Sequence, residues 1–459
     1  MNRNFFYVPP KGDITLDFIR KCIERKLSSN GRMNNLENYY VGKQPIMEKV
    51  QPSASSPDNK VLTNYCKVIA DFFATTLTGK PIEYDSIKPK DMDVVQEVFD
   101  ENDIESEDSE LATMLNVFGV AYEQVFIDDE GKLRFTTVDP REVIIIRDRT
   151  AKATPVCVLK VWKFCEDDEF YMVERYEEGF VTTYKYYNGN QRLENVDKKS
   201  YMLDRLPFIE LIANEYEQSV FEQVLTLQDA YNKLVSLQID DYEGFVDSFL
   251  GIYNAGGTQD EDIAAMKQNR VLLLDGDSKA EWIVKNANPA VIEEIKTSLE
   301  KNIHQISLLP DFSDENFTGN SSGVSIKYKM IGANSVVAKQ QRAFSECVES
   351  RLKFIISYLN AKNGASLDFA DFSYTFKTLQ IDEDETITDM IEKLADKIPL
   401  ASLAKNLSFT TPDDIELIKK ADEKKFSEDN KFSEDNKFSE KKTSEVLPMT
   451  PEEIIAREG

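Results

Sequence analysis

Residues 219–250 read SVFEQVLTLQDAYNKLVSLQIDDYEGFVDSFL, and apolar side chains recur along this stretch every three or four positions. That spacing places them on one face of a helix. The face consists of Val224, Leu227, Tyr231, Leu234, Tyr242, Phe245 and Phe249. At about 1.5 Å per residue, a helix over 219–250 would be roughly 48 Å long, well beyond an average globular helix. We expect the rest of the chain to be organised around this element.

A second long helix is predicted over residues 289–309. Asn288 is a good N-cap, Pro289 suits the first helical position, and Pro310 ends the run. The apolar stripe of this helix consists of Val291, Ile292, Ile295, Leu299, Ile303 and Ile306.

The segment between these helices has the pattern of a β-hairpin. Residues 271–274 and 280–284 are the expected strands, and Asp275-Gly276 is the expected turn. Two long helices are therefore predicted to leave the body of the protein and return to it, with a small β tip between them.

A third long helix is predicted over residues 323–362, after a short loop at 310–322. Its apolar stripe is Phe344, Val348, Leu352, Ile355 and Leu359, and a kink is expected at Gly332. This helix has seven basic and two acidic side chains, against a net charge of −27 for the whole chain. The basic residues are Lys327, Lys329, Lys339, Arg342, Arg351, Lys353 and Lys362.

The bulk properties exclude several classes of protein. No apolar run approaches the roughly 20 residues of a membrane span, and MNRNFFYVPPKGD lacks the apolar core of a signal peptide, so a cytoplasmic product is expected. The five cysteines form no CxxC pair, which indicates reduced thiols and no zinc ribbon. A net charge of −27 has the wrong sign for sequence-specific DNA binding.

The sequence predicts no catalytic residue, no metal site and no cofactor. The single histidine, His304, lies beside the Ile303 stripe, which favours an interface or helix-end role over catalysis. No GxxxxGK[ST] motif occurs, so a motor ATPase is not encoded. The acidic cluster Asp382–Glu385 is the best candidate for magnesium binding, but it precedes an apolar helical run and fits helix N-terminal charge better.

The remaining segments predict a mixed α and β chain. Helices are expected over 13–28 (capped by Asp13), up to Gly42, and over 59–77. Six strands are expected at 122–127, 133–138, 143–146, 156–164, 170–175 and 180–187, within a β-rich region at 119–212. A last strand within 372–381 and short helices at 386–395 and 413–421 follow, and the KFSEDN repeat makes 425–459 a disordered tail.

Four segments resemble the portal proteins of siphovirus-type tailed bacteriophages. DFSDENFTGNSSGVSIKYKM (311–330), following the second long helix, is similar to the tunnel-loop region of that family. NYYVGKQPIM (38–47), NKVLTNYCKVIADFFATTLTGKPIEY (59–84) and LQDAYNKLVSLQIDDYEGF (227–245) resemble other parts of the family in the same order. The resemblance covers roughly residues 38–425.

The resemblance implies an α+β portal-protein fold with named parts. Its β-rich wing would occupy residues 1–218, the first stem helix 219–250, the small α/β clip 251–288 and the second stem helix 289–309. The tunnel loop, the long bent helix and the wing and helical crown would follow at 310–322, 323–362 and 363–424.

The resemblance also implies site residues. The tunnel loop would present Asp311, Phe312, Ser313, Asp314, Glu315, Asn316 and Phe317. Phe317 is expected to anchor the loop, whereas Phe312 either anchors it or narrows the channel. Basic residues expected to meet DNA phosphates are Lys327, Lys329, Lys339 and Arg342, the alternative being ion pairs with a neighbouring subunit. The clip would bind partners through Asp260, Glu261, Asp262, Asp275, Gly276 and Trp282.

The implied function is that of a ring-forming channel, dodecameric by analogy, at the unique capsid vertex. Its expected partners are copies of itself, the large terminase subunit, a head-completion adaptor, scaffolding and major capsid proteins, and double-stranded DNA in passage. The chain would be assembled in the host bacterial cytoplasm and end in the virion. The excess of acidic residues would then either line the channel and repel the passing DNA, or keep the protein soluble. The alternatives are an intracellular metal-dependent nuclease-like enzyme that uses Asp382–Glu385, and a head-tail connector of another symmetry.

Overall fold

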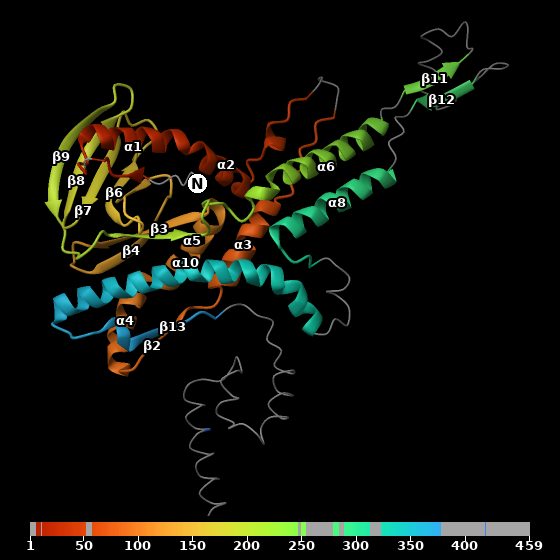
Figure 1. Ribbon diagram of the computed structural model, residues 1–459. Helices are drawn as coiled ribbons and strands as arrows, with labels where there is room; N and C mark the ends of the chain where they lie inside the picture. The colour runs from red at the N-terminus through yellow and green to blue at the C-terminus, as the bar shows by residue number, and fades with distance from the viewer. Residues whose placement is uncertain are drawn as a thin grey trace, which may run out of the picture. The chain divides into compact units, whose positions relative to one another are not determined.

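The computed structural model describes residues 6–10, 12–51, 57–246, 249–253, 279–283, 289–312, 323–377 and 418 (Figure 1). All the elements below belong to one compact unit, Met1–Leu379. The second unit, Gln380–Gly459, is described at residue 418 alone. The predictions for Asp382–Glu385, for helices at 386–395 and 413–421 and for the tail therefore lie outside the described residues, apart from a helical conformation at 418.

Five helices come from the amino-terminal part of the chain: α1 (Leu16–Ser29), α2 (Gly31–Val41), α3 (Tyr65–Thr78), α4 (Pro89–Asn102) and α5 (Ile104–Phe118). The expectation that Asp13 caps the first helix was wrong, because Thr15 accepts the capping hydrogen bond from the Phe18 N–H. The predicted end of α2 is confirmed, since Gly42 adopts the left-handed conformation that glycine favours there. Helices α4 and α5 were not predicted.

The β-rich region is built from two sheets. The larger has the order β1-β5-β6-β7-β8-β9 and the smaller the order β10-β3-β4. The six predicted strands are confirmed as β3 (Val120–Ile127), β4 (Leu133–Val138), β5 (Val143–Arg147), β6 (Pro155–Trp162), β7 (Tyr171–Glu177) and β8 (Phe180–Tyr187). Strands that were not predicted are β1 (Phe6–Tyr7), β9 (Arg192–Ser200) and β10 (Phe208–Ile212).

Two apolar cores hold this unit together. In the smaller core, Ile19, Cys22 and Ile23 of α1 pack on the inner face of the six-stranded sheet, against Ile144, Ile146, Cys157, Leu159 and Tyr186. The larger core joins α2, α3 and α5 to the three-stranded sheet and to α10 (Gly323–Asn363). Figure 1 shows α10 running along the opposite side of α3 and α5 from α1. The last strand, β13 (Phe372–Thr375), pairs with β2 (Glu83–Ser86), so the predicted strand is confirmed for four residues.

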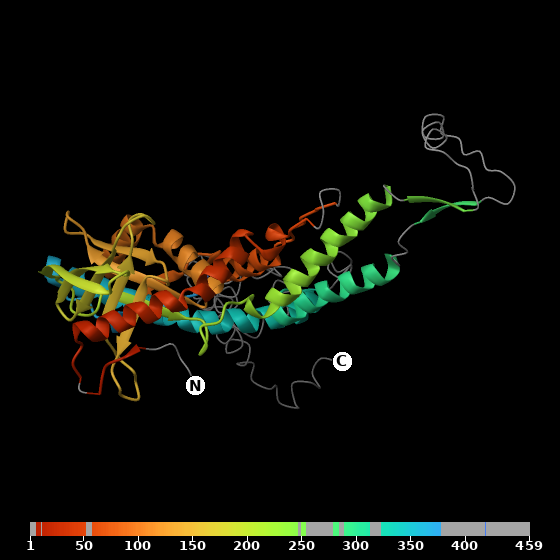
Figure 2. The ribbon, with the colours of Figure 1, turned by 90° about the horizontal axis from the view of Figure 1, so that it is seen from above.

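The two long helices are α6 (Leu225–Val246) and α8 (Pro289–Ser307), which lie side by side (Figures 1 and 2). The second prediction is confirmed, with Pro289 opening α8. The first was wrong at both ends, since a 3₁₀ turn, Glu222–Val224, precedes α6 and strand β11 (Phe249–Tyr253) replaces its last turn. The apolar residues Phe249 and Leu250 fit the end of a helix and the start of a strand equally well.

The β tip includes one strand pair that was not predicted, and the predicted hairpin of 271–274 with 280–284 is not tested. Strand β12 (Lys279–Ile283) pairs antiparallel with β11, with Leu250 opposite Trp282. The expected partner, residues 271–274, lies outside the described residues.

Helix α10 is continuous over its 41 residues and bends near its amino-terminal end (Figure 1). At Gly332 an added Cβ would lie 3.3 Å from Leu308 Cδ2, so the glycine allows close approach to the segment after α8. Among the described helices, none has an apolar stretch long enough to cross a bilayer.

Candidate functional site

A polar stripe on α6 holds an extended segment of the chain. Four side chains spaced four residues apart accept hydrogen bonds from alternate backbone N–H groups of residues 59–65. The pairs are Gln228 with Tyr65 (3.0 Å), Asn232 with Thr63 (2.9 Å), Ser236 with Val61 (3.0 Å) and Asp240 with Asn59 (2.8 Å). We call these pairs the α6 ladder.

The hydrogen bonds of the α6 ladder stay in step because the helix rise and the extended-chain length between successive pairs are nearly equal. Four helical residues rise about 6 Å, and two extended residues span about 6.6 Å. Gln228, Asn232 and Ser236 are fully buried. Their bonds draw residues 59–64 out of helical geometry, so the prediction that the helix begins at Asn59 was wrong. Helix α3 begins at Tyr65, and Asn64 accepts its capping hydrogen bond from the Lys67 N–H.

The first segment of the resemblance also contacts α6. Asn232 donates to Gln44 Oε1 at 2.7 Å, and Gln44 in turn donates to Asn64 Oδ1 at 2.9 Å. Lys49 forms an ion pair with Asp240, the last residue of the α6 ladder. Residues 38–47 and 59–84, which resemble the portal family separately, are thus bound together on one helix. A polar residue at every fourth position of α6 was the sequence signal for this arrangement.

Tyr65 contacts the carboxyl-terminal end of α8. Its hydroxyl donates to Glu300 Oε1 at 2.7 Å, and its ring meets those of Tyr231 and His304 edge-on. His304 Nδ1 lies 3.2 Å from the Leu309 carbonyl oxygen, which places this histidine at the helix end as predicted.

Two tunnel-loop residues are described. The Phe312 ring lies 6.0 Å from that of Phe72 on α3, although Phe312 remains 52% exposed. This contact favours the anchoring alternative for Phe312. Asp311, also described, precedes it, and residues 313–317 lie outside the described part of the chain.

The predicted DNA-facing residues of α10 are placed only in part. Lys339 and Arg342 line a groove of about 340 Å³ together with carboxylates of the same chain, Glu210, Glu215, Glu217 and Glu346. Lys329 is partly buried, and the Lys327 side chain lies outside the described part. DNA contact stays a prediction for all four.

Arg351 of α10 cannot meet DNA, because it is fully buried. Its guanidinium forms ion pairs with Asp108 of α5 at 2.8 Å and with Glu123 of β3 at 2.7 Å. Burial raises the pKa of both carboxyls, and the Arg351 charge opposes that rise. One cation between two carboxylates therefore joins α5, β3 and α10. A charge inside the apolar stripe of α10 was the sequence signal for this cluster.

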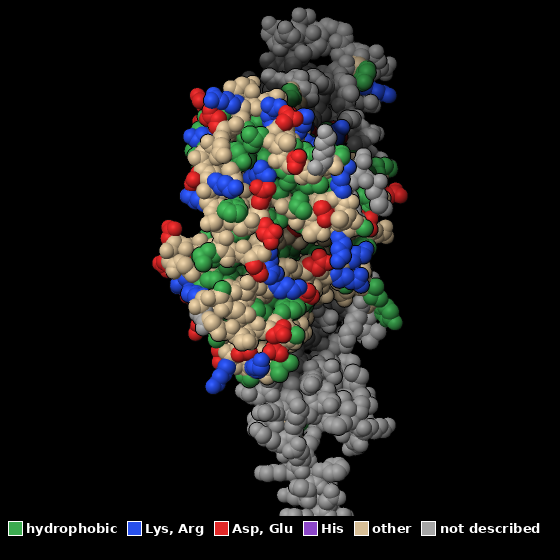
Figure 3. Space-filling model, turned by 60° about the vertical axis from the view of Figure 1, so that its left-hand side comes forward, with side chains coloured by type: hydrophobic (Ala, Val, Ile, Leu, Met, Phe, Trp, Pro, Cys, Tyr) green, Lys and Arg blue, Asp and Glu red, His purple; other side chains and the backbone are tan. Residues whose placement is uncertain are grey.

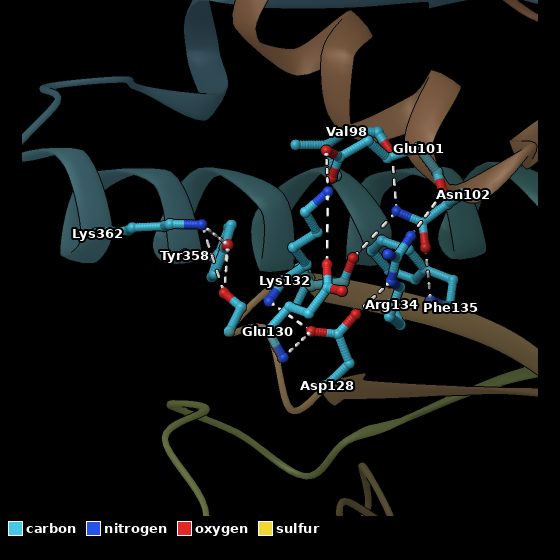
Figure 4. Close-up of polar contacts among 12 residues, drawn as sticks. Val98, Glu101, Asn102, Asp128, Glu130, Lys132, Arg134, Phe135, Tyr358 and Lys362 are labelled. Atoms are coloured by element: carbon cyan, nitrogen blue, oxygen red, sulfur yellow. Dashed lines mark hydrogen bonds and ion pairs between the residues drawn. The ribbon is translucent and has the colours of Figure 1, made fainter.

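The far end of α10 is attached to the β3–β4 hairpin (Figure 4). Asp128 accepts a hydrogen bond from Arg134 Nε at 2.7 Å, and this bond is the main cause of the lowered pKa of Asp128. Arg134 also donates to the Glu101 carbonyl of α4 at 2.6 Å. From α10, the Tyr358 hydroxyl donates to the Gly131 carbonyl at 2.8 Å. The turn thus ties α4 to α10.

Few of the predicted clip residues can be placed. Trp282 lies in β12, and Asp260, Glu261, Asp262, Asp275 and Gly276 lie outside the described residues. Within the described ranges, no three His, Cys, Asp or Glu side chains gather closely enough to hold a metal ion.

Comparisons with known proteins identify a family, a relative and a solved structure that this chain resembles. The family model "Phage portal protein, SPP1 Gp6-like" matches residues 19–428. The portal protein of Clostridium phage phiCD119 is 21% identical over 444 residues, which are 88% of this chain and 95% of the relative. The solved structure "Neck of empty GTA particle computed with C6 symmetry" has a TM-score of 0.44 and 12% identity, over 84% of this chain and 92% of that one. Since the family model covers most of its length, the chain belongs to the phage portal proteins of the SPP1 Gp6-like family.

Proposed function

We propose that this chain is the subunit of a closed ring, a dodecamer, that forms the channel at the unique vertex of a phage capsid. Genomic DNA would enter through this channel during packaging by the terminase motor and leave through it at ejection. Family membership supports this proposal, and the family is structural rather than enzymatic, so the nuclease alternative is not favoured.

The exposed apolar residues of α6 and α8 are the main structural support for ring formation. The inner parts of α6 and α8 are buried in the body, for example Tyr231 at 5% and Ile303 at 0% exposure. Other apolar residues of the two helices stay exposed within the described chain, namely Leu237, Ile239, Tyr242, Val291, Ile295 and Ile306, at 37–76%. An apolar surface of this kind is covered most economically by further copies of the same chain in a closed symmetric assembly.

The proposal gives each part of the chain a place in the ring. In the proposal, α6 and α8 are the stem, and residues 251–288 are the clip that meets the terminase large subunit and later the head-completion adaptor. Residues 310–322 are the tunnel loop, with Asp311, Asp314 and Glu315 toward the DNA. The β-rich wing faces outward to scaffolding and major capsid proteins, and residues 363–424 complete the wing and crown.

The charge pattern suits a channel without sequence specificity. Figure 3 shows basic and acidic side chains interspersed over one face of the described unit, so the net charge of −27 is not spread as one acidic field there. Lys339 and Arg342 would meet passing phosphates only transiently, because Glu210, Glu215, Glu217 and Glu346 share their groove. Assembly would take place in the host bacterial cytoplasm, with the ring ending in the virion.

The test is assembly of the purified full chain, viewed by electron microscopy. Wild-type protein should form rings with a central hole, and the double variant Val291→Asp, Ile295→Asp should remain monomeric. Val196→Asp is the matched control, since Val196 is 53% exposed but lies on β9. Monomeric wild-type protein in all salts, or rings in the double variant, would contradict the proposal.

A further inference from the structure

A small cavity with an excess of positive charge lies between α1, α2 and strands β3, β5 and β10. Its volume is about 60 Å³, which is room for a few water-sized groups. The charged residues around it are Arg25, Lys26, Arg32, Arg147, Glu210 and Glu217. Four cations thus face two carboxylates in a chain whose net charge is −27.

Three of the four cations have interactions within the chain. Arg147 forms an ion pair with Glu210, and Arg32 forms one with Glu222 at 2.6 Å. Arg25, which is exposed, lies over the ring of Phe6, 4.8 Å from its centroid. These interactions leave Lys26 as the cation to be explained.

Lys26 is only 8% exposed, and within the described chain its ammonium has neither a hydrogen bond nor an ion pair. Deprotonation of Lys26 does not remove the need for a partner. Burial lowers the pKa of Lys26 to about 8, against the opposing effect of the Glu217, Asp139 and Glu210 carboxylates, so the side chain is still mostly charged at neutral pH. These carboxylates supply part of the counter-charge, but an ammonium largely removed from water also needs a hydrogen-bond acceptor.

We propose that this cavity binds a small inorganic oxyanion, with phosphate as the probe. Lys26 would make the central contact, and Arg25 and Arg32 would flank the anion from α1 and α2. A space of this size fits an inorganic ion and not a nucleic-acid strand. The bound anion would connect α1 and α2 to β5 and to the turn at Glu217 that leads toward α6, and so stabilise this part of the wing. The inference does not depend on ring formation.

The test compares phosphate with chloride at equal ionic strength in thermal unfolding of the full chain at pH 7. Millimolar phosphate should raise the wild-type Tm by about 2 °C or more, because an anion that binds only the folded state stabilises it. Lys26→Met should lose this response. It should still fold, since it replaces a buried charge with an apolar side chain of similar length. Lys21→Met is the matched control on α1, as Lys21 is 69% exposed, and it should respond like wild type.

Two outcomes would overturn the proposal. One is a wild-type Tm that responds to phosphate no more than to chloride, which would mean that the cavity holds water. The other is an equal phosphate response in wild type and Lys26→Met. If the variant aggregates, calorimetric titration of wild-type protein decides the question, because the absence of phosphate-specific heat also refutes the site. Arg25→Gln should weaken the response without abolishing it.

Discussion

Asn232 of helix α6 accepts a hydrogen bond from the backbone N–H of Thr63 at 2.9 Å, and its amide donates to Gln44 at 2.7 Å. This buried amide links two segments that are far from α6 in the sequence. Any tilt of α6 would have to carry residues 59–65 with it or break the α6 ladder. Helix α6 is thereby coupled to helix α3, which begins where the ladder ends.

Asn232→Leu should destabilise the protein markedly. The substitution leaves the Thr63 N–H and the Gln44 amide oxygen without their partner, which costs roughly 1–3 kcal/mol for each buried group. The free energy of unfolding from chemical denaturation measures the loss, and limited proteolysis should reveal faster cleavage in residues 49–60. Lys233→Leu, at the exposed neighbouring position, is the control. Equal stability of the two variants would mean that the ladder contributes little.

Arg351→Met should be more damaging, and its effect should depend on pH. The change leaves Asp108 and Glu123 buried without their cation, and breaking such a cluster costs about 3–5 kcal/mol. A carboxyl whose pKa is raised by folding favours the folded state only while it is protonated. Stability is therefore lost as pH rises from the unfolded pKa, about 4, through the folded one.

The deficit of Arg351→Met should accordingly be larger at pH 7.5 than at pH 5, as measured by denaturation at both values. Glu123→Gln should cost far less, because Asp108 still pairs with the guanidinium. Lys353→Met is the control, since the Lys353 side chain is 40% exposed and pairs with Glu349 on the same helix. A deficit that does not change with pH would argue against charge as its cause.

Local patterns predicted much of this fold, and the failures have identifiable causes. Strands β3–β8 and helix α8 follow directly from period-two runs and from Pro289. Residues 59–64 were misassigned because side chains of α6, far away in the sequence, bind their backbone. Val61 and Ser236, for example, are 175 positions apart. Phe249 was misassigned because an apolar residue fits the end of a helix and the start of a strand equally well.

The candidate site was predictable to a smaller extent. Arg351 lies on the apolar face of α10, seven residues after Phe344, and Lys339 does not, so the sequence indicated burial for Arg351 but not the partners of its charge. The packing of α5 and β3 supplies these partners, since Arg351 is buried between Asp108 and Glu123. Residues that face a channel are defined by neighbouring copies of the chain, and the pattern of a single chain does not encode that arrangement.

Gly119→Ala should be among the most disruptive small substitutions. An added Cβ would lie 2.2 Å from the Glu217 carbonyl oxygen, in a backbone with φ of +80°. Gly179 provides a matched control, with φ of +77° and no atom within 4 Å. Gly179→Ala should therefore cost only the backbone strain, about 1 kcal/mol, and Gly119→Ala several times more. Thermal unfolding of the two variants measures the difference, and similar Tm values would show that the turn at Glu217 shifts easily.

Neutralising the proposed tunnel loop should separate assembly from packaging. The triple variant Asp311→Asn, Asp314→Asn, Glu315→Gln removes three negative charges from a segment that follows the described base of α8, where Tyr65 and Leu309 hold the helix end. Rings should still form, because the exposed apolar residues of α6 and α8 are unchanged. DNA packaging in a phage complementation assay should fall, because the charges that would keep the loop from gripping phosphates are lost. Normal packaging with intact rings would remove these three residues from the channel lining, whereas loss of the rings would assign them to subunit contacts.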